Sequence, residues 1–124
     1  MPASVGFLVV DSVDPEALAP FWCALLGVEV SSRFDDGRYV ILSPTGGGLR
    51  ITFQRVPEAK SGKNRLHLDL DVEDLDAATA EVERLGGRWM EPGTLRDIEG
   101  FRWRCMADPE GNEFDLVSEA SASG

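Results

Sequence analysis

An internal repeat is the feature that most constrains how this chain can fold. The second half can be laid on the first without a gap, and residues of the same type then coincide. The matched pairs are Asp71 with Asp11, Asp74 with Asp14, Ala77 with Ala17, Leu85 with Leu25 and Gly87 with Gly27. In each half a strand and a helix precede three further strands. Agreement of element order, helix length and helix caps indicates a duplicated β-α-β-β-β module.

The helix of the first module has clear boundary signals. Asp14 can cap free N–H groups, Pro15 fits the first helical position, and Glu16 complements the positive helix end. Apolar residues then recur at helical spacing until Gly27, which is a typical helix-ending glycine. Pro20 lies inside this pattern and predicts a kink or a late start, because proline removes one backbone hydrogen bond.

The second module begins with a strict alternation of apolar and polar residues, which predicts a strand over residues 64–72. One face carries Leu66, Leu68 and Leu70, and the other carries His67, Asp69 and Asp71. We expect the leucines to pack under a helix over residues 73–85. The other predicted strands span 5–10, 28–34, 38–43, 49–55, 88–91, 101–107 and 112–118, with a loop over 92–100.

These elements predict an α+β fold within a single domain. Module one covers about residues 4–56, a linker spans 57–63, and module two covers about 64–118. Each helix can cover only one face of its sheet. We therefore expect two curved mixed sheets around a cup, with the helices on the outside. Polar side chains that converge in such a concavity are typical of a ligand site.

Charge and apolar patterning exclude several classes of partner. A net charge of −10 disfavours nucleic acid, because phosphates would be repelled; it keeps the protein soluble and would favour a cationic ligand. The chain has no apolar run long enough to span a membrane and no signal-peptide pattern, so a cytoplasmic location is expected. Cys23 and Cys105 fit buried small hydrophobes rather than a disulfide.

Four segments, spread over nearly the whole chain, carry a resemblance to a known superfamily. They are Asp14 to Gly27, Leu49 to Glu58, Arg65 to Val72 and Ala107 to Val117, the last containing D-P-E-G-N. With the lone histidine, they resemble the vicinal-oxygen-chelate superfamily, which includes glyoxalase I, extradiol dioxygenases, and bleomycin- and fosfomycin-resistance proteins. The chain is most similar to the glyoxalase-like subgroup of bacterial proteins.

The resemblance also implies where a metal would bind. Metal-using members take one ligand from each of the first, fourth, fifth and eighth strands. The fifth-strand position matches His67, and the eighth matches Asp115, where glutamate is more usual. The fourth falls on Thr52 by the repeat, or on Gln54 with a two-residue shift. The first falls on Phe7, which cannot bind a metal. His67 and Asp115 are thus candidate ligands for a divalent metal such as Zn, Ni, Mn or Fe, in an incomplete set.

The candidate ligand-binding residues are those expected to line the cup. They are Phe7, Trp22, Arg50, Thr52, Gln54, His67, Asp69, Trp103 and Asp115. Aromatic rings can stack on a planar ligand, and an inward arginine suits a carboxylate or phosphate. His67 is the candidate catalytic residue. Without a metal, a neighbouring carboxylate from Asp69 or Asp115 would favour its charged form.

Two functions follow as hypotheses. The first is a metal-free binding protein of the drug-resistance or sequestration type, which holds an aromatic or cationic small molecule near His67, Asp115 and Gln54. The second is a metal-dependent lyase or isomerase of the glyoxalase type that acts on a small oxygenated substrate. A transferase or hydrolase with His67 as general base is a third possibility. The resemblance also implies a homodimer, since related proteins often complete the cup across two chains.

Overall fold

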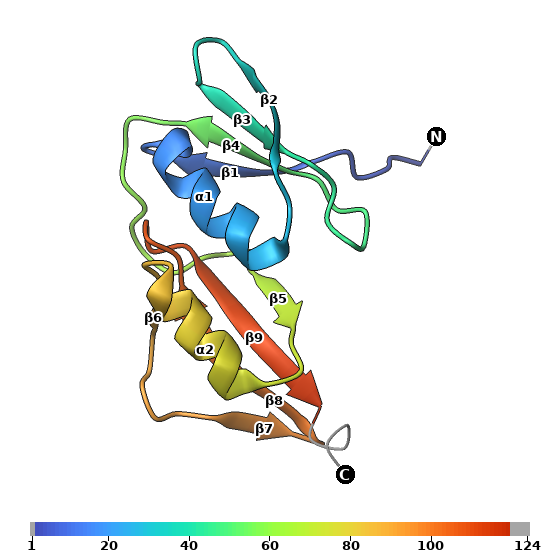
Figure 1. The fold of residues 1–124 in the computed structure, drawn as a ribbon, viewed down its shortest axis with the longest axis vertical. Helices are drawn as coiled ribbons and strands as arrows, with labels where there is room; N and C mark the ends of the chain where they lie inside the picture. Colours follow the sequence, from blue (N-terminus) through green and yellow to red (C-terminus); the bar gives the residue numbers. More distant parts are fainter. Residues whose placement is uncertain (1, 120–124) are drawn as a thin grey trace. The chain divides into compact units, whose positions relative to one another are not determined.

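The computed structural model describes residues 2–119, which form two compact units divided between Lys60 and Ser61. Each unit holds one helix and one mixed sheet (Figure 1). Two helices and two mixed sheets confirm the α+β class predicted from the repeat. No described helix has both the length and the apolar character that crossing a membrane requires.

The first unit packs its helix on one face of a four-stranded sheet (Figure 1). The sheet order is β1-β4-β3-β2; β1 runs parallel to β4, and the other pairs are antiparallel. The elements are β1 (Leu8–Ser12), α1 (Pro15–Leu26), β2 (Val30–Phe34), β3 (Tyr39–Leu42) and β4 (Ile51–Arg55).

The second unit repeats this plan with one extra strand. Its first strand, β5, again runs parallel to its last strand, β9, and the sheet order is β5-β9-β8-β6 with β7 also paired to β8. The elements are β5 (Leu68–Asp71), α2 (Leu75–Arg84), β6 (Arg88–Trp89), β7 (Arg96–Ile98), β8 (Phe101–Ala107) and β9 (Glu113–Glu119).

Both helices begin at the predicted aspartate caps. The Asp14 carboxylate accepts a hydrogen bond from the Ala17 N–H at 3.2 Å, and Asp74 accepts one from Ala77 at 3.1 Å. Each bond satisfies an N–H that lacks a partner in the first helical turn. α1 starts at Pro15 and continues through Pro20, so the late start that Pro20 suggested is wrong. Gly27, with φ of 68°, ends α1 in the left-handed region as predicted.

The core of each unit lies between its helix and its sheet. Large apolar side chains of the helix and of the sheet are almost fully buried there, and burying one such side chain stabilises the fold by about 1.5–3 kcal/mol. In the first unit they are Leu18, Phe21, Trp22, Val40, Leu42, Ile51 and Phe53; in the second, Leu75, Val82, Met106, Phe114 and Leu116.

Two strands, β1 and β5, begin three and four residues later than the sequence predicted, whereas the other predicted strands differ by at most two residues at either end. The strand predicted over 64–72 contains only Leu68–Asp71, and Leu66 is 70% exposed rather than packed under α2. The segment before β5 is instead held by side chains, because Asn64 and Glu113 exchange hydrogen bonds of 3.0 and 3.2 Å. β1 is shifted towards the C-terminus of its predicted range because its pairing with β4 continues to Ser12 opposite Arg55.

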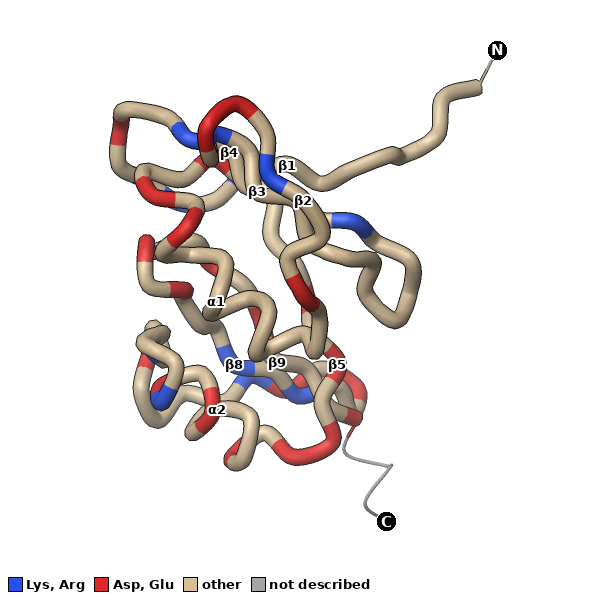
Figure 2. Tube along the Cα trace, turned by 45° about the horizontal axis from the view of Figure 1, so that its top comes forward, with Lys and Arg blue, Asp and Glu red and all other residues tan. Residues whose placement is uncertain are grey.

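A third difference is β7, which lies in the predicted loop over 92–100. Its residues Arg96–Ile98 pair with the first residues of β8 around a turn in which Glu99 and Gly100 have positive φ. The β2–β3 turn, by contrast, was correctly predicted at Asp35, Asp36 and Gly37, all with positive φ. Acidic residues occur in both units, and this turn is among the acidic segments in Figure 2.

The duplicated helix caps generate the first prediction. Asp14→Ala and Asp74→Ala should each lower the free energy of unfolding by about 1 kcal/mol, because each leaves a first-turn N–H without its acceptor. Asp14→Asn and Asp74→Asn are the matched controls: they remove the charge and keep the capping oxygen, so they should lose clearly less. Urea unfolding followed by circular dichroism measures all four. Equal losses for alanine and asparagine would show that charge, not capping, stabilises the helix ends.

Candidate functional site

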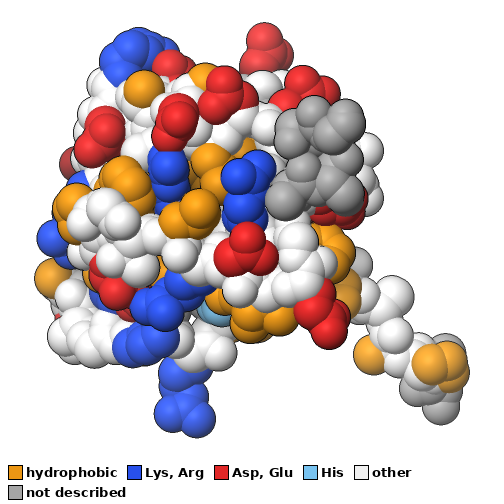
Figure 3. Space-filling model, turned by 90° about the horizontal axis from the view of Figure 1, so that it is seen from below, with side chains coloured by type: hydrophobic (Ala, Val, Ile, Leu, Met, Phe, Trp, Pro, Cys, Tyr) orange, Lys and Arg blue, Asp and Glu red, His pale blue; other side chains and the backbone are white. Residues whose placement is uncertain are grey.

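The His67 cluster, consisting of His67, Asp69 and Asp115, brings three polar side chains of the second unit together. The His67 Nε2 atom lies 3.3 Å from Asp69 Oδ1 and 3.3 Å from Asp115 Oδ2. One ligand atom of each residue lies within 4.8 Å of the other two. The side chains of His67, Asp69 and Asp115 are 46%, 61% and 16% exposed, and part of the histidine is visible at the surface in Figure 3.

The strand register explains why these residues meet. In the parallel β5–β9 ladder, Asp69 lies beside Asp115, while Leu68 and Leu70 lie beside Phe114 and Leu116. Successive residues of a strand point to opposite faces, so the leucines take the helix-covered face and the aspartates take the other. His67 directly precedes β5 and reaches both carboxylates. The predicted meeting of His67 with Asp69 and Asp115 is therefore present.

Asp115 is the less exposed of the two carboxylates in the His67 cluster. Burial raises its pKa above the ordinary value, and the negative charge of Asp69 acts in the same direction. A hydrogen bond from Cys105 and the charge of His67 oppose this rise without reversing it. The pair of carboxylates is thus costly to keep charged, and a cation placed between them would lower that cost.

Cys105 is a neighbour of the His67 cluster, and the sequence did not predict that its thiol contacts a cluster residue. It lies opposite Asp115 in the β8–β9 ladder and is half-buried, and it interacts with both Asp115 and Arg96. Burial, followed by the charge of Asp115, raises the pKa of its thiol, so the thiol form is favoured. The alternation of β8 was the available signal, because Trp103 and Cys105 share one face of that strand.

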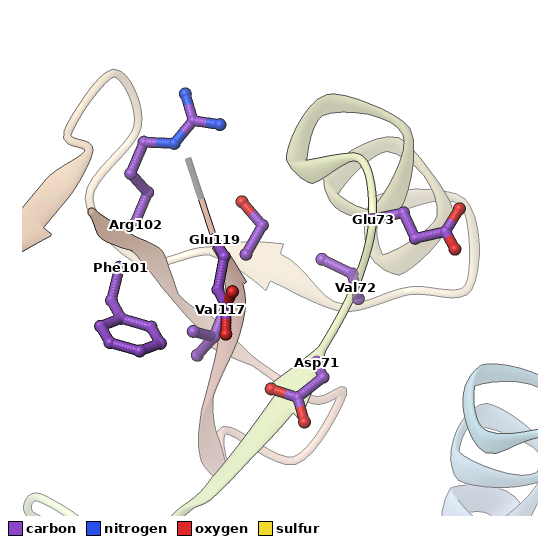
Figure 4. A pocket seen from close by; sticks show the side chains of 8 residues that line it. Asp71, Val72, Glu73, Phe101, Arg102, Val117 and Glu119 are labelled. Carbon is purple, nitrogen blue, oxygen red and sulfur yellow. The ribbon is translucent and has the colours of Figure 1, made fainter. Parts of the chain in front are cut away.

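A hollow of about 570 Å³ lies two residues further along the same strands. Figure 4 shows it between the end of β5 and the ends of β8 and β9. Its lining residues are Asp71, Val72, Glu73, Phe101, Arg102, Val117, Ser118 and Glu119. Trp103 is half-buried and pairs with Val117 in the same ladder. Phe101, 50% exposed, is an aromatic side chain of this region that the sequence prediction did not include.

Five predicted site residues belong to the first unit, namely Phe7, Trp22, Arg50, Thr52 and Gln54. The Arg50 guanidinium stacks on the Phe7 ring at 4.3 Å, and Gln54 Nε2 donates to Asp11 Oδ1 at 3.4 Å. Thr52 is only 6% exposed. Because Val9 pairs with Thr52 as Asp69 pairs with Asp115, the ladder supports Thr52 rather than Gln54 as the counterpart of Asp115.

Trp22 is a correction to the predicted ligand-binding set. Its side chain is 5% exposed in the core between α1 and the sheet, and it meets Phe21 edge-to-face at 5.4 Å between ring centroids. The helical spacing that made Trp22 a candidate places it on the buried side of α1. It therefore contributes to packing and not to the opposite, ligand-accessible face of the sheet.

The His67 cluster has the chemistry of a divalent-metal site. Imidazole and carboxylate donors suit first-row metals. With metal–ligand bonds of about 2.1 Å, neighbouring donors are about 3.0–3.4 Å apart, and the two distances from His67 Nε2 are 3.3 Å. His67 and Asp115 were the predicted ligands, and the structure adds Asp69 as a third donor within the same unit.

Duplicated β-α-β-β-β units with polar donors on an open sheet face define the vicinal-oxygen-chelate class of proteins. The chain belongs to the glyoxalase-like domain family, whose model matches residues 7–117. No curated protein matches the chain by sequence.

Solved structures share the fold at low sequence identity. A glyoxalase/bleomycin resistance protein/dioxygenase family enzyme from Burkholderia phytofirmans has a TM-score of 0.75 at 16% identity, covering 91% of this chain and 96% of that one. The genomically encoded fosfomycin resistance protein FosX of Listeria monocytogenes reaches 0.76 at 16%, covering 95% and 92%. The oxidase ChaP-H2 reaches 0.70 at 20%, covering 96% and 95%. These similarities establish the fold.

The raised pKa of Asp115 generates a prediction about stability and pH. When the pKa of a carboxyl group is higher in the folded than in the unfolded state, its ionisation lowers the free energy of unfolding. This loss is complete once pH has risen through the folded-state pKa, and it is absent at pH values below the unfolded-state pKa. Asp115→Asn should therefore raise the unfolding temperature at neutral pH, with the gain disappearing in acid.

The matched control is Asp69→Asn, because Asp69 lies in the same ladder but is 61% exposed, so its gain should be smaller. Thermal unfolding is measured from acid to neutral pH in the presence of a chelator. A loss of stability in Asp115→Asn at neutral pH would show that its contacts with His67 and Cys105 outweigh the cost of burial.

Proposed function

We propose that this protein binds a small molecule through a cationic group held by the His67 cluster. The observation that carries the proposal is the convergence of two carboxylates on one side chain, with Asp115 only 16% exposed. A ligand cation would donate hydrogen bonds to two charged acceptors, and such charge-assisted bonds are the stronger kind. The net charge of −10 would also raise the rate at which cations meet the protein.

The rest of the ligand is assigned an aromatic or apolar character. The sheet continues from Asp115 to Val117 and Trp103, and then to Phe101 at the edge of the hollow. Such side chains offer flat apolar surface beside the charged cluster. Asp71 and Glu119 add negative charge to the hollow, so a ligand with its positive charge spread over a planar group fits best.

Benzamidinium, a planar aromatic cation, is a suitable probe. It should shift the amide resonances of residues 67–71 and 113–117 in an NMR titration, and Asp115→Asn should weaken its binding about tenfold because one charged acceptor is lost. Benzamide, which has the same shape without the charge, should not bind measurably. Glu83→Gln is the matched charge control, since Glu83 is exposed on α2 outside the cluster.

Equal weakening in Glu83→Gln and Asp115→Asn would reduce the effect to overall charge. Equal binding of benzamide and benzamidinium would contradict the cationic-group assignment.

A metal-dependent lyase or isomerase of the glyoxalase type is the second candidate. It is favoured by the three donor atoms of the His67 cluster, where the sequence offered only two ligands. Three protein ligands leave positions for two oxygens of a small substrate, and a bound divalent metal would supply Lewis-acid polarisation of those oxygens. His67 would then be a ligand; in the metal-free protein it stays the candidate general base.

Metal-binding calorimetry tests the second candidate independently of any substrate. Zn²⁺, Ni²⁺, Mn²⁺ and Fe²⁺ are titrated into wild type, His67→Ala, Asp69→Asn and Glu83→Gln. Stoichiometric binding that is lost in the first two variants and kept in Glu83→Gln would support it, because only cluster donors were removed. Absence of binding by all four metals would contradict it and leave the metal-free proposal.

A further inference from the structure

We propose a second binding site, in the first unit, for the phosphate group of a small phosphate ester. The site is a hollow of about 410 Å³ lined by Val13, Arg38, Arg55, Val56 and Pro57. It shares no residue with the His67 cluster and does not depend on the function proposed for that cluster.

Arg38 and Arg55 are held opposite each other by the backbone. Arg38 ends the β2–β3 turn, Arg55 ends β4, and the Arg55 N–H donates to the Arg38 carbonyl oxygen at 2.8 Å. Like charges placed directly opposite on neighbouring strands are destabilising. An anion between the two guanidinium groups would remove this repulsion, so the strand pairing prepares the site for negative charge.

The chain leaves this pair of arginines without acidic partners. Among residues 2–119, no carboxylate forms an ion pair with either side chain, although the chain has 22 acidic residues for 12 basic ones. Four of the eight other arginines form ion pairs within the described part of the chain, namely Arg33 with Glu16, Arg84 with Glu81, Arg96 with Glu91 and Arg104 with Asp76. The Arg38 guanidinium lies 5.9 Å from the Tyr39 ring centroid, a contact that leaves its N–H donors available.

The composition of the hollow selects the ligand. Two guanidinium groups match the charge of a phosphate monoester dianion and can each donate two parallel hydrogen bonds to its oxygens. The hollow also has an apolar wall, formed by Val13, Val56 and Pro57. This wall suits the organic substituent of a phosphate ester better than it suits the water shell of free phosphate. The attraction between the two arginines and a phosphate should weaken as salt rises, because salt screens exposed charges. Asp35, Asp36 and Glu58 are near in sequence and would oppose any anion.

Phenyl phosphate is the probe, with inorganic phosphate and benzoate as comparisons at constant ionic strength. In an NMR titration it should shift the amides of residues 13, 38 and 55–56 of wild type. Arg38→Gln and Arg55→Gln should each weaken its binding about tenfold, because a charged bidentate donor is lost. Arg33→Gln is the matched control, since it removes the same charge from β2 but from a side chain already paired with Glu16 at 2.7 Å.

Thermal unfolding supplies a second readout that needs no assigned resonances. Phenyl phosphate should raise the unfolding temperature of wild type and of Arg33→Gln, and should leave Arg38→Gln and Arg55→Gln nearly unchanged. Without ligand, Arg55→Gln should be at least as stable as wild type, because a like-charge contact is gone.

Equal responses in all four proteins, or no response in wild type, would overturn the site. If inorganic phosphate binds as tightly as phenyl phosphate, the role of the apolar wall is overturned. If benzoate binds as tightly as phenyl phosphate, the assignment of the site to a phosphate group is overturned.

Discussion

The parallel pairing of the first and last strands of each unit is the constraint on which the rest of the structure depends. β1 pairs with β4 and β5 pairs with β9, and each pair is held in register along its length. Because a one-residue slip would turn every side chain to the other face, the buried leucines and phenylalanines of these strands fix the register. The same register places Asp69 beside Asp115. The core therefore determines the geometry of the His67 cluster, although no cluster residue belongs to the core.

That arrangement has an energetic consequence for the second unit. Asp115 lies on a strand whose alternate residues, Phe114 and Leu116, are almost fully buried, so its carboxylate cannot move far towards solvent. Its raised pKa is the measure of this confinement. A mobile surface aspartate would relax away from Asp69, and the cation binding that we propose for the cluster would weaken. The neighbouring apolar contacts thus hold the two carboxylates close together, although their mutual repulsion is unfavourable when no cation lies between them.

The periodic parts of the fold could be predicted from the sequence, and the parts held by individual side chains could not. Alternation in residues 66–71 and the caps at Asp14 and Asp74 are local signals, and they identified the strand face, the helices and the position of His67 beside the two aspartates. Leu66 was misplaced because alternation continues into a segment that side-chain hydrogen bonds, not the ladder, hold in place. β7 was missed because it is three residues long and is defined by its partner β8. Trp22 was misassigned because helical spacing alone does not show which face is buried.

The duplication explains why the two units differ in chemistry while sharing a scaffold. The positions equivalent to His67, Asp69 and Asp115 are Phe7, Val9 and Thr52, and the β1–β4 ladder aligns the last two as the β5–β9 ladder aligns the aspartates. None of these three side chains carries charge, so the first unit has no equivalent cation site. Arg38 and Arg55, which form no ion pair with a carboxylate of residues 2–119, lie instead at one end of the two central strands of its sheet. One scaffold thus carries acidic groups on the open face of the second sheet and basic groups at one end of the first. Apart from the extra strand β7, the two units share their element order and their parallel pairing of first and last strands, so the different ligands that we propose for them depend on a few side chains at fixed register positions.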